Sequence, residues 1–209
     1  FRYSKMPSIK LTYFDVRGLG EPARLILNHA KVPFEDVRIN QDQWPTMKQN
    51  FKTGKVPCLE YDGQELYESY AIHRFLARKY GLAGKDDFEQ AIVDSIADIQ
   101  KDFYFAMTPW FYNILGFAPG DAAELREKHF VPNIPRFLPI FSGFLKESGS
   151  GFMVKSGLTW ADFVISEYLF SLKRLEPEVL KDYPEISAWL DRIQEVPQLK
   201  DYYKNRKWD

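Results

Sequence analysis

One stretch, GKVPCLEYDGQELYESYAIHRFLARKYG (residues 54–81), contains the clearest structural signals of this chain. Two short runs, 57–61 and 64–67, flank the dipeptide Asp62-Gly63, which favours the backbone angles of a two-residue hairpin turn. Apolar residues then recur at helical spacing, and Gly81 is a residue type that commonly follows the end of a helix. The stretch therefore predicts a β-hairpin followed by a helix, with Ser69 as the helix N-cap.

The segment before this hairpin alternates between strand and helix patterns. Residues 9–13 alternate apolar and polar side chains, as a half-buried strand does. Glu21-Pro22 opens a helix, because a proline at the first helical position has no N–H to leave unsatisfied. A second strand at 34–39 and a short irregular helix within 41–51 follow. The predicted order of this half is βαβαββα.

The rest of the chain has helical patterns only. Apolar residues from Ile92 to Phe103 mark one long helix, and three prolines between 132 and 139 predict a break or kink. Thr159 and Asp162 have the three-residue spacing of a capping box at a helix start. We therefore expect an α/β domain at 6–83 and an all-α domain at 84–209, and we leave residues 1–5, before Met6, out of the fold.

Composition narrows the function classes. The 209 residues have a net charge of −1, which argues against broad electrostatic binding to nucleic acid or to anionic lipid. The single cysteine, Cys58, excludes an internal disulfide and favours a reducing, cytoplasmic location. No run approaches the roughly 18 apolar residues that a membrane-spanning helix needs, so no membrane association is predicted.

Common catalytic and metal motifs are missing from the sequence. The three histidines, His29, His73 and His129, share no ligand spacing with one another or with Cys58, so no metal site is predicted. The chain has no G-x-S-x-G elbow, P-loop or dinucleotide-binding glycine signature. Cys58 follows Pro57 on a strand, where no helix dipole lowers its pKa, and we interpret it as a buried apolar residue.

Two short motifs each have two interpretations. Val56-Pro57 is either an ordinary edge-strand proline or a cis peptide whose neighbouring backbone pairs with an extended peptide ligand. Ser69 is either a plain N-cap or, together with Glu68, part of an anion site at a helix N-terminus. The second interpretation would let these residues hold the carboxylate and ammonium of an amino-acid ligand.

Several blocks, in order along nearly the whole chain, resemble the sigma-class glutathione S-transferases. They are Lys10–Phe14, Arg17-Gly18 with Glu21–Arg24, Gly54–Pro57, Glu68–Ile72 and Leu158–Phe163. The resemblance implies a thioredoxin-like domain followed by an all-helical domain, in a homodimer. It also implies glutathione as co-substrate with no further cofactor, and a hydrophobic electrophile as the second substrate.

The resemblance also assigns roles to residues. Tyr13 matches the catalytic tyrosine. The residues that match glutathione contacts are Tyr13, Trp44, Lys48, Lys55, Val56, Pro57, Glu68, Ser69 and, across the dimer interface, Asp102. The candidates for the electrophile pocket are Phe14, Tyr104 and Trp110, with Trp208 as a further wall. Without the resemblance, the favoured interpretation of Tyr13 is an aromatic core residue of a strand.

The assigned role of Tyr13 is chemically reasonable. A thiol with a pKa of about 8.5 is mostly protonated at neutral pH, and a phenol O–H that donates to sulfur stabilises the thiolate. Two positions depart from the family pattern. Leu19 stands where an arginine often lies near the catalytic hydroxyl, and Glu68 replaces the glutamine of the γ-glutamyl site.

The predicted function is conjugation of glutathione to hydrophobic electrophiles, as in detoxification. Two enzymatic alternatives use the same thiolate: isomerisation of prostaglandin H₂ to D₂, and reduction of organic peroxides. A different class of function is a carrier of the ligandin type or a lens-crystallin-like protein that has kept the fold without the activity.

Overall fold

The computed structural model describes residues 6–207. The contacts within the chain group it into two compact units. One contains the part up to Ala83 together with the segment from Gln194, and the other runs from Gly84 to Ile193. We call them the α/β unit and the helical unit. The expected all-α domain included residues 194–209, whereas the contacts of that last segment group with the α/β unit.

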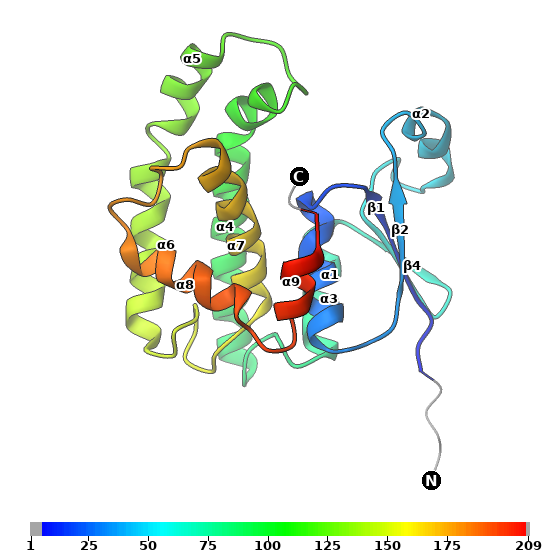
Figure 1. Ribbon diagram of the computed structural model, residues 1–209. Coiled ribbons are helices and arrows are strands. Elements are labelled where there is room, and N and C mark those ends of the chain that lie inside the picture. Colours follow the sequence, from blue (N-terminus) through cyan, green and yellow to red (C-terminus); the bar gives the residue numbers. More distant parts are fainter. Residues whose placement is uncertain (1–5, 208–209) are drawn as a thin grey trace. The chain divides into compact units, whose positions relative to one another are not determined.

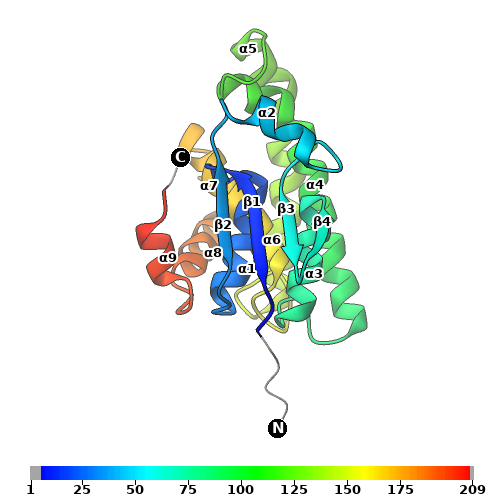
Figure 2. The ribbon, with the colours of Figure 1, turned by 90° about the vertical axis from the view of Figure 1, so that its right-hand side faces the viewer.

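The α/β unit contains a four-stranded mixed sheet (Figure 2). Its elements are β1 (Ile9–Phe14), α1 (Glu21–His29), β2 (Glu35–Ile39), α2 (Trp44–Met47), β3 (Cys58–Tyr61), β4 (Gln64–Tyr67), α3 (Ser69–Lys79) and α9 (Lys200–Asn205), with short 3-10 turns at Gly18–Gly20 and Lys48–Asn50. The strand order is β2-β1-β3-β4. β1 is parallel to β2 and antiparallel to β3, and β3 is antiparallel to β4. The predicted βαβαββα order is confirmed.

Helices α1 and α3 lie side by side on one face of this sheet (Figures 1 and 2). The burial of α1 explains its sequence, since the side chains of Leu25, Ile26 and Leu27 are fully buried. Such a helix has almost no exposed face, and it therefore holds the end of β1 in a fixed position. Helix α2 lies at the end of the sheet toward which β1 and β2 run (Figure 1).

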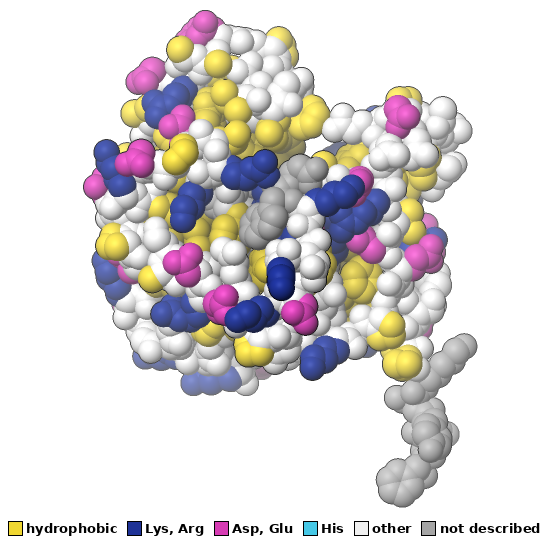
Figure 3. Space-filling view, in the orientation of Figure 1, with side chains coloured by type: hydrophobic (Ala, Val, Ile, Leu, Met, Phe, Trp, Pro, Cys, Tyr) yellow, Lys and Arg dark blue, Asp and Glu magenta, His cyan; other side chains and the backbone are white. Residues whose placement is uncertain are grey.

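The helical unit contains α4 (Asp87–Ile114), α5 (Ala122–Leu125), a π-helical turn (Arg126–Phe130), α6 (Ile134–Ser148), α7 (Trp160–Leu175) and α8 (Pro184–Gln194), the last of which ends at the unit boundary. α7 is its central helix, with twelve buried residues. Over α6 and α8, basic and acidic side chains are interspersed (Figure 3). None of the helices within residues 6–207 is long and apolar enough to span a membrane.

Most local signals are confirmed. The capping box is present, with Thr159 and Asp162 each bonding the backbone of the other. Gly81 has a φ of +75°, as a residue after a helix end does. The peptide bond between Val56 and Pro57 is cis, which favours the second interpretation of that motif.

One expectation about helices was wrong in detail, and the expected break at the three prolines is confirmed in part. α3 begins at Ser69, and the N-cap position belongs to Glu68, whose side chain makes no capping bond. Among the three prolines, Pro132 lies in the break before α6 and Pro135 lies in its first turn, but Pro139 lies inside α6 without ending it. A proline within the second turn removes only one early N–H, and the buried face of α6 keeps the helix intact.

Candidate functional site

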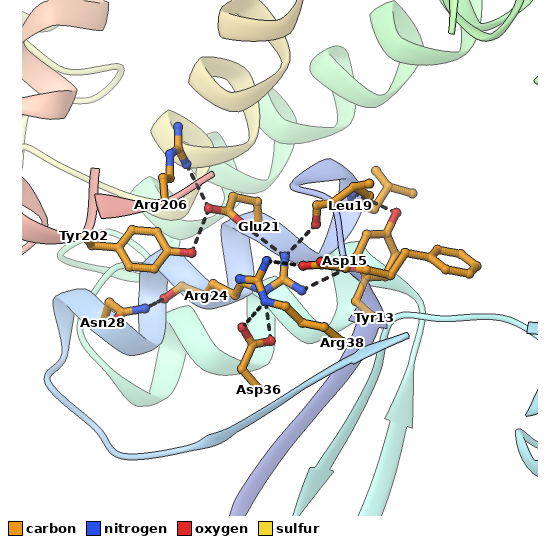
Figure 4. A network of polar contacts seen from close by, with 12 residues as sticks. Tyr13, Asp15, Leu19, Glu21, Arg24, Asn28, Asp36, Arg38, Tyr202 and Arg206 are labelled. Carbon is orange, nitrogen blue, oxygen red and sulfur yellow. Dashed lines mark hydrogen bonds and ion pairs between the residues drawn. The ribbon is translucent and has the colours of Figure 1, made fainter. Parts of the chain in front are cut away.

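Tyr13 lies at the carboxyl end of β1, next to the turn that leads into α1. Its side chain is buried, and its hydroxyl oxygen accepts a hydrogen bond of 3.1 Å from the backbone N–H of Leu19 (Figure 4). A hydroxyl has one proton to donate and two lone pairs to accept with. The bond from Leu19 uses a lone pair, so it does not consume the proton of Tyr13.

Two glycines let the turn fit around the Tyr13 ring. A Cβ atom on Gly20 would lie 2.6 Å from Cδ1 of Tyr13, and one on Gly18 would lie 2.8 Å from the hydroxyl oxygen. Gly18 also has a φ of +40°, which is unfavourable for other residues. The glycines therefore bring the backbone N–H of Leu19 close enough to bond the phenol, a role that the sequence pattern alone did not reveal.

A histidine from another helix holds the same peptide. His73, on α3, is fully buried, and its Nε2 lies 3.2 Å from the carbonyl oxygen of Leu19. Burial lowers the pKa of His73 to about 3, so the ring is neutral and Nε2–H donates to this carbonyl. The sequence showed only that His73 has no metal-ligand spacing to the other histidines or to Cys58. Its role was missed because the two residues are 54 positions apart.

At position 19, where the sequence departs from the family pattern, the main chain and not a side chain contacts the Tyr13 hydroxyl. The family pattern often has an arginine there, and this chain has Leu19. The hydrogen bond to Tyr13 comes from the main chain, which does not depend on the side chain at this position. The guanidinium carbon of Arg24 lies 5.9 Å from the centre of the Tyr13 ring and is paired with Glu21 and Asp36.

Aromatic side chains continue from Tyr13 along the same end of the sheet. The Phe14 ring lies 5.5 Å from the Tyr13 ring and 5.3 Å from the Trp44 ring, both in edge-on contact. Trp44 in turn packs 5.7 Å from Phe51. The structure thus brings together one expected pocket residue, Phe14, and one expected glutathione contact, Trp44, next to Tyr13.

The other glutathione positions of the α/β unit fall on three neighbouring segments. Lys48 and Lys55 are exposed, and a Cβ on Gly54 would lie 3.4 Å from the Lys48 side chain, so the two loops are in contact. The cis bond joins Val56, which is partly exposed, to the buried Pro57 at the start of β3.

Glu68 and Ser69 lie where β4 turns into α3. Glu68 has a φ of +67°, which is uncommon for a residue with a side chain. Its side chain is exposed, whereas Ser69 is buried at the first position of α3. The N–H groups of a first helical turn have no acceptors within the helix, so this end of α3 can bind a carboxylate.

The remaining expected site residues lie on α4 of the helical unit. Asp102 is exposed. The hydroxyl oxygens of Tyr104 and Tyr112 lie 2.8 Å apart, and Trp110 is 1% exposed with its ring 4.6 Å from that of Phe130. Trp110 therefore belongs to the core of this unit. The site roles expected for Asp102, Tyr104 and Trp110 stay predictions.

Trp208, the other expected wall of the pocket, lies outside the described residues.

Cys58 and the metal-ligand residue types are the other reactive groups that the sequence raised. Cys58 is buried, and this burial raises the pKa of its thiol, which disfavours the reactive thiolate. Between residues 6 and 207, no three His, Cys, Asp or Glu side chains are grouped as metal ligands would be.

Comparison with protein families and known proteins gives a consistent result. Residues 9–78 match the glutathione S-transferase N-terminal domain, and residues 106–206 match the C-terminal domain of the same family. Glutathione S-transferase 1 of Ascaris suum is 43% identical over 201 residues, which cover 96% of this chain and 98% of that protein. A crystal structure of a Caenorhabditis elegans glutathione S-transferase superposes with a TM-score of 0.92 at 41% identity, covering 97% of this chain and 98% of the other.

Two further similar structures bear on class and activity. One is a Nu-class enzyme of Haemonchus contortus, with a TM-score of 0.88 and 39% identity over 97% of this chain and 98% of the other. The other is a prostaglandin synthase D of Nilaparvata lugens, with a TM-score of 0.85 and 32% identity over 96% of this chain and 99% of the other. On both sequence and structure, this chain is an enzyme that belongs to the glutathione S-transferase family.

Proposed function

We propose that this enzyme conjugates glutathione to hydrophobic electrophiles, with Tyr13 as the residue that stabilises the thiolate. One observation carries the proposal: the N–H of Leu19 donates to the Tyr13 hydroxyl, which orients the phenol through a lone pair of its oxygen and not through its proton. A phenol that already accepts a hydrogen bond is polarised and becomes a better donor.

The energy required is within reach of this arrangement. Lowering the pKa of a thiol from about 8.5 by two units needs about 2.7 kcal/mol. A hydrogen bond to a charged acceptor contributes about 1.5–3 kcal/mol. The guanidinium of Arg24, 5.9 Å from the centre of the Tyr13 ring, is paired with Glu21 and Asp36, so the hydrogen bond from the phenol is the main contribution. The thiolate then attacks the electrophilic carbon, a C–S bond forms, and the leaving group departs with the electron pair.

The remainder of the glutathione would bind along the same end of the unit. The N-terminus of α3 at Ser69 suits the γ-glutamyl carboxylate, and the Glu68 carboxylate suits its ammonium group. The backbone of Val56, beside the cis bond, suits the cysteinyl unit. Lys48 and Lys55 suit the terminal carboxylate, and we expect them to contribute modestly because they are exposed.

Isomerisation of prostaglandin H₂ to D₂ is a second candidate activity. It is favoured by the similarity to the Nilaparvata lugens prostaglandin synthase D. The same thiolate would serve both reactions, so assays with each substrate separate them. Reduction of organic peroxides belongs in the same panel of assays.

Assembly, class and location complete the proposal. We expect a homodimer in which Asp102 reaches the partner's glutathione site, although one similar structure, from Necator americanus, is described as monomeric (TM-score 0.90, 40% identity, 96% of this chain and 98% of the other). Light scattering on the purified protein decides this point. The sequence motifs resemble the sigma class, whereas one similar structure is of a Nu-class enzyme, so both classes remain candidates for this chain. The single buried cysteine supports a cytoplasmic location.

Replacement of the Tyr13 hydroxyl tests the mechanism. Tyr13→Phe should lower kcat/KM for a hydrophobic electrophile by about one to three orders of magnitude, or about 1.4 kcal/mol per factor of ten. Retention on immobilised glutathione should be nearly unchanged. Tyr67→Phe, a tyrosine of β4, is the matched control and should retain full turnover. Unchanged turnover in Tyr13→Phe would contradict this mechanism, whereas retention on glutathione without turnover in the original protein would favour a carrier or crystallin-like protein.

A further inference from the structure

A buried carboxylate joins the start of α1 to the carboxyl-terminal helix. Glu21 is 1% exposed, and its Oε1 accepts hydrogen bonds from the Tyr202 hydroxyl at 2.8 Å and from Nη1 of Arg206 at 2.9 Å. Its Oε2 accepts a bond of 3.0 Å from Nη1 of Arg24 (Figure 4). Tyr202 is on α9 and lies 181 residues after Glu21 in the sequence. Burial beside this carboxylate raises the pKa of Tyr202, so its hydroxyl stays protonated and donates.

The guanidinium of Arg24 transmits this contact toward the site. Arg24 is fully buried and also donates to the carbonyl oxygens of Val16 at 2.8 Å and Phe14 at 3.3 Å. Its Nε donates to Asp36 at 3.0 Å. Arg24 therefore holds the main chain directly after Tyr13, where the chain leaves β1.

The geometry of a guanidinium links these bonds to one another. Its donors lie in one rigid plane, so the partners of Arg24 must be positioned together. Glu21 is the partner that α9 holds in place, through Tyr202 and Arg206. A shift of Glu21 would therefore turn Arg24 and loosen its two carbonyl contacts at the end of β1.

The outer side of the same cluster differs from the Glu21 side. Asp15 pairs with Arg38 at 3.2 Å and with Lys207 at 3.0 Å, and Arg38 pairs with Asp36 at 2.8 Å. Asp15, Arg38 and Lys207 border a cavity of about 440 Å³ that Glu21, Tyr202 and Arg206 also line, and Lys207 is 66% exposed whereas Glu21 is 1% exposed. Water screens such pairs, so they contribute little compared with the closed contacts of Glu21.

We propose that Glu21 is a positioning residue of the thiol-activating site, and that α9 acts on Tyr13 through it by way of Tyr202 and Arg206. This inference rests on the proposed role of Tyr13. It predicts that the carboxyl-terminal helix affects thiol ionisation although Tyr202 does not contact Tyr13 in this network. It also predicts that the effect depends on the hydrogen bonds to Glu21 and not on the general stability of α9.

The test uses the full-length enzyme and the substitution Tyr202→Phe, which removes one hydroxyl and keeps the ring. The kcat/KM for the electrophile should fall about threefold to tenfold, the loss expected for one hydrogen bond. The acid limb of the pH profile should move to higher pH by about half a unit to one unit, while KM for glutathione changes less than kcat. Arg206→Lys keeps the positive charge but replaces the guanidinium that donates to Glu21 with an ammonium group. It should move the pH profile in the same direction.

Lys200→Ala is the matched control on the same helix. It removes the Lys200–Glu195 ion pair and leaves the contacts of Glu21 in place. It should leave the pH profile unchanged. Equal shifts in Tyr202→Phe and Lys200→Ala, or a lower melting temperature of Tyr202→Phe with an unchanged profile, would overturn the inference.

Tyr13→Phe, assayed in parallel, separates the two proposals. If Tyr13→Phe is impaired and Tyr202→Phe and Arg206→Lys are not, only the positioning role fails. If Tyr13→Phe is fully active, the proposed function fails with it.

Discussion

The turn around Tyr13 and the capping box of α7 are both small clusters of hydrogen bonds, but they are built differently. In the capping box, Asp162 accepts bonds from the backbone and side chain of Thr159, three residues away. At the Tyr13 turn, the bond from Leu19 depends on His73 and on two glycines. The first cluster is local in sequence and stabilises the fold. The second combines distant residues and orients one hydroxyl.

The clearest way to sharpen this comparison is to remove the carboxylate of the capping box. Asp162 is fully buried and also accepts bonds from the backbone of Met153 at 3.0 Å and the Trp189 ring at 3.1 Å. Asp162→Ala leaves four buried donors without an acceptor, so the free energy of unfolding should fall by about 4 kcal/mol. Urea denaturation measures this loss.

The folded fraction of Asp162→Ala should keep its kcat/KM per active molecule, because the capping box is not part of the Tyr13 site. The comparison breaks down if thiol activation is lost while stability is retained.

A methyl group at the turn should have the opposite pattern. Gly20→Ala places a Cβ within 2.6 Å of the Tyr13 ring, so the ring must move. A displacement of about 1 Å at a reacting group can cost about a hundredfold, and we expect kcat/KM to fall by about that factor. The melting temperature should change much less.

Gly143→Ala is the matched control, since a Cβ at this helical position meets no atom within 4 Å. It should be neutral or stabilising by up to about 1 kcal/mol, because alanine favours a helix more than glycine does. Equal activity losses in the two variants would mean that the fit around Tyr13 is not what matters.

The smallest expected effect concerns acid stability. The pKa of His73 is lowered to about 3, below its unfolded value of about 6.5, so the unfolded chain binds more protons between these values. The stability due to neutral His73 is therefore full above pH 6.5 and is lost as the pH falls. His73→Gln removes this titration, so its stability deficit relative to the original protein should shrink by about 2 kcal/mol between pH 6.5 and 5.

Unfolding measured at several pH values gives this difference directly. A deficit that stays constant over the range would show that His73 is not a buried neutral group. The difference between the two proteins is the useful quantity because the pKa of Asp162 is raised to about 6 by burial. The contribution of Asp162 to the stability of the protein falls as the pH rises from about 4 to 6, which is opposite to the pH dependence of the His73 contribution.

Much of the fold could be predicted because its signals are short-range. The Asp62-Gly63 turn, Gly81 at a helix end and the Thr159–Asp162 box each depend on neighbours within a few residues. The error at Ser69 has the same origin in reverse. A serine before a helical pattern favours the N-cap, but the turn out of β4 gives that position to Glu68 with a positive φ.

The sequence by itself determined the order of strands and helices, the turn and cap positions, and the family, because these depend on local chemistry and on blocks of residues in register. Only the tertiary structure decided what holds Tyr13: the main-chain N–H of Leu19, the buried His73, and the Glu21–Arg24 pair held by α9. The physical reason is that nearly every residue type has the same backbone N–H, so the residue type does not show which N–H donates to Tyr13. Leu19 and His73 are separated by 54 positions in the sequence, and Glu21 and Tyr202 by 181 positions. These pairs come into contact only when burial of the apolar core brings their elements together.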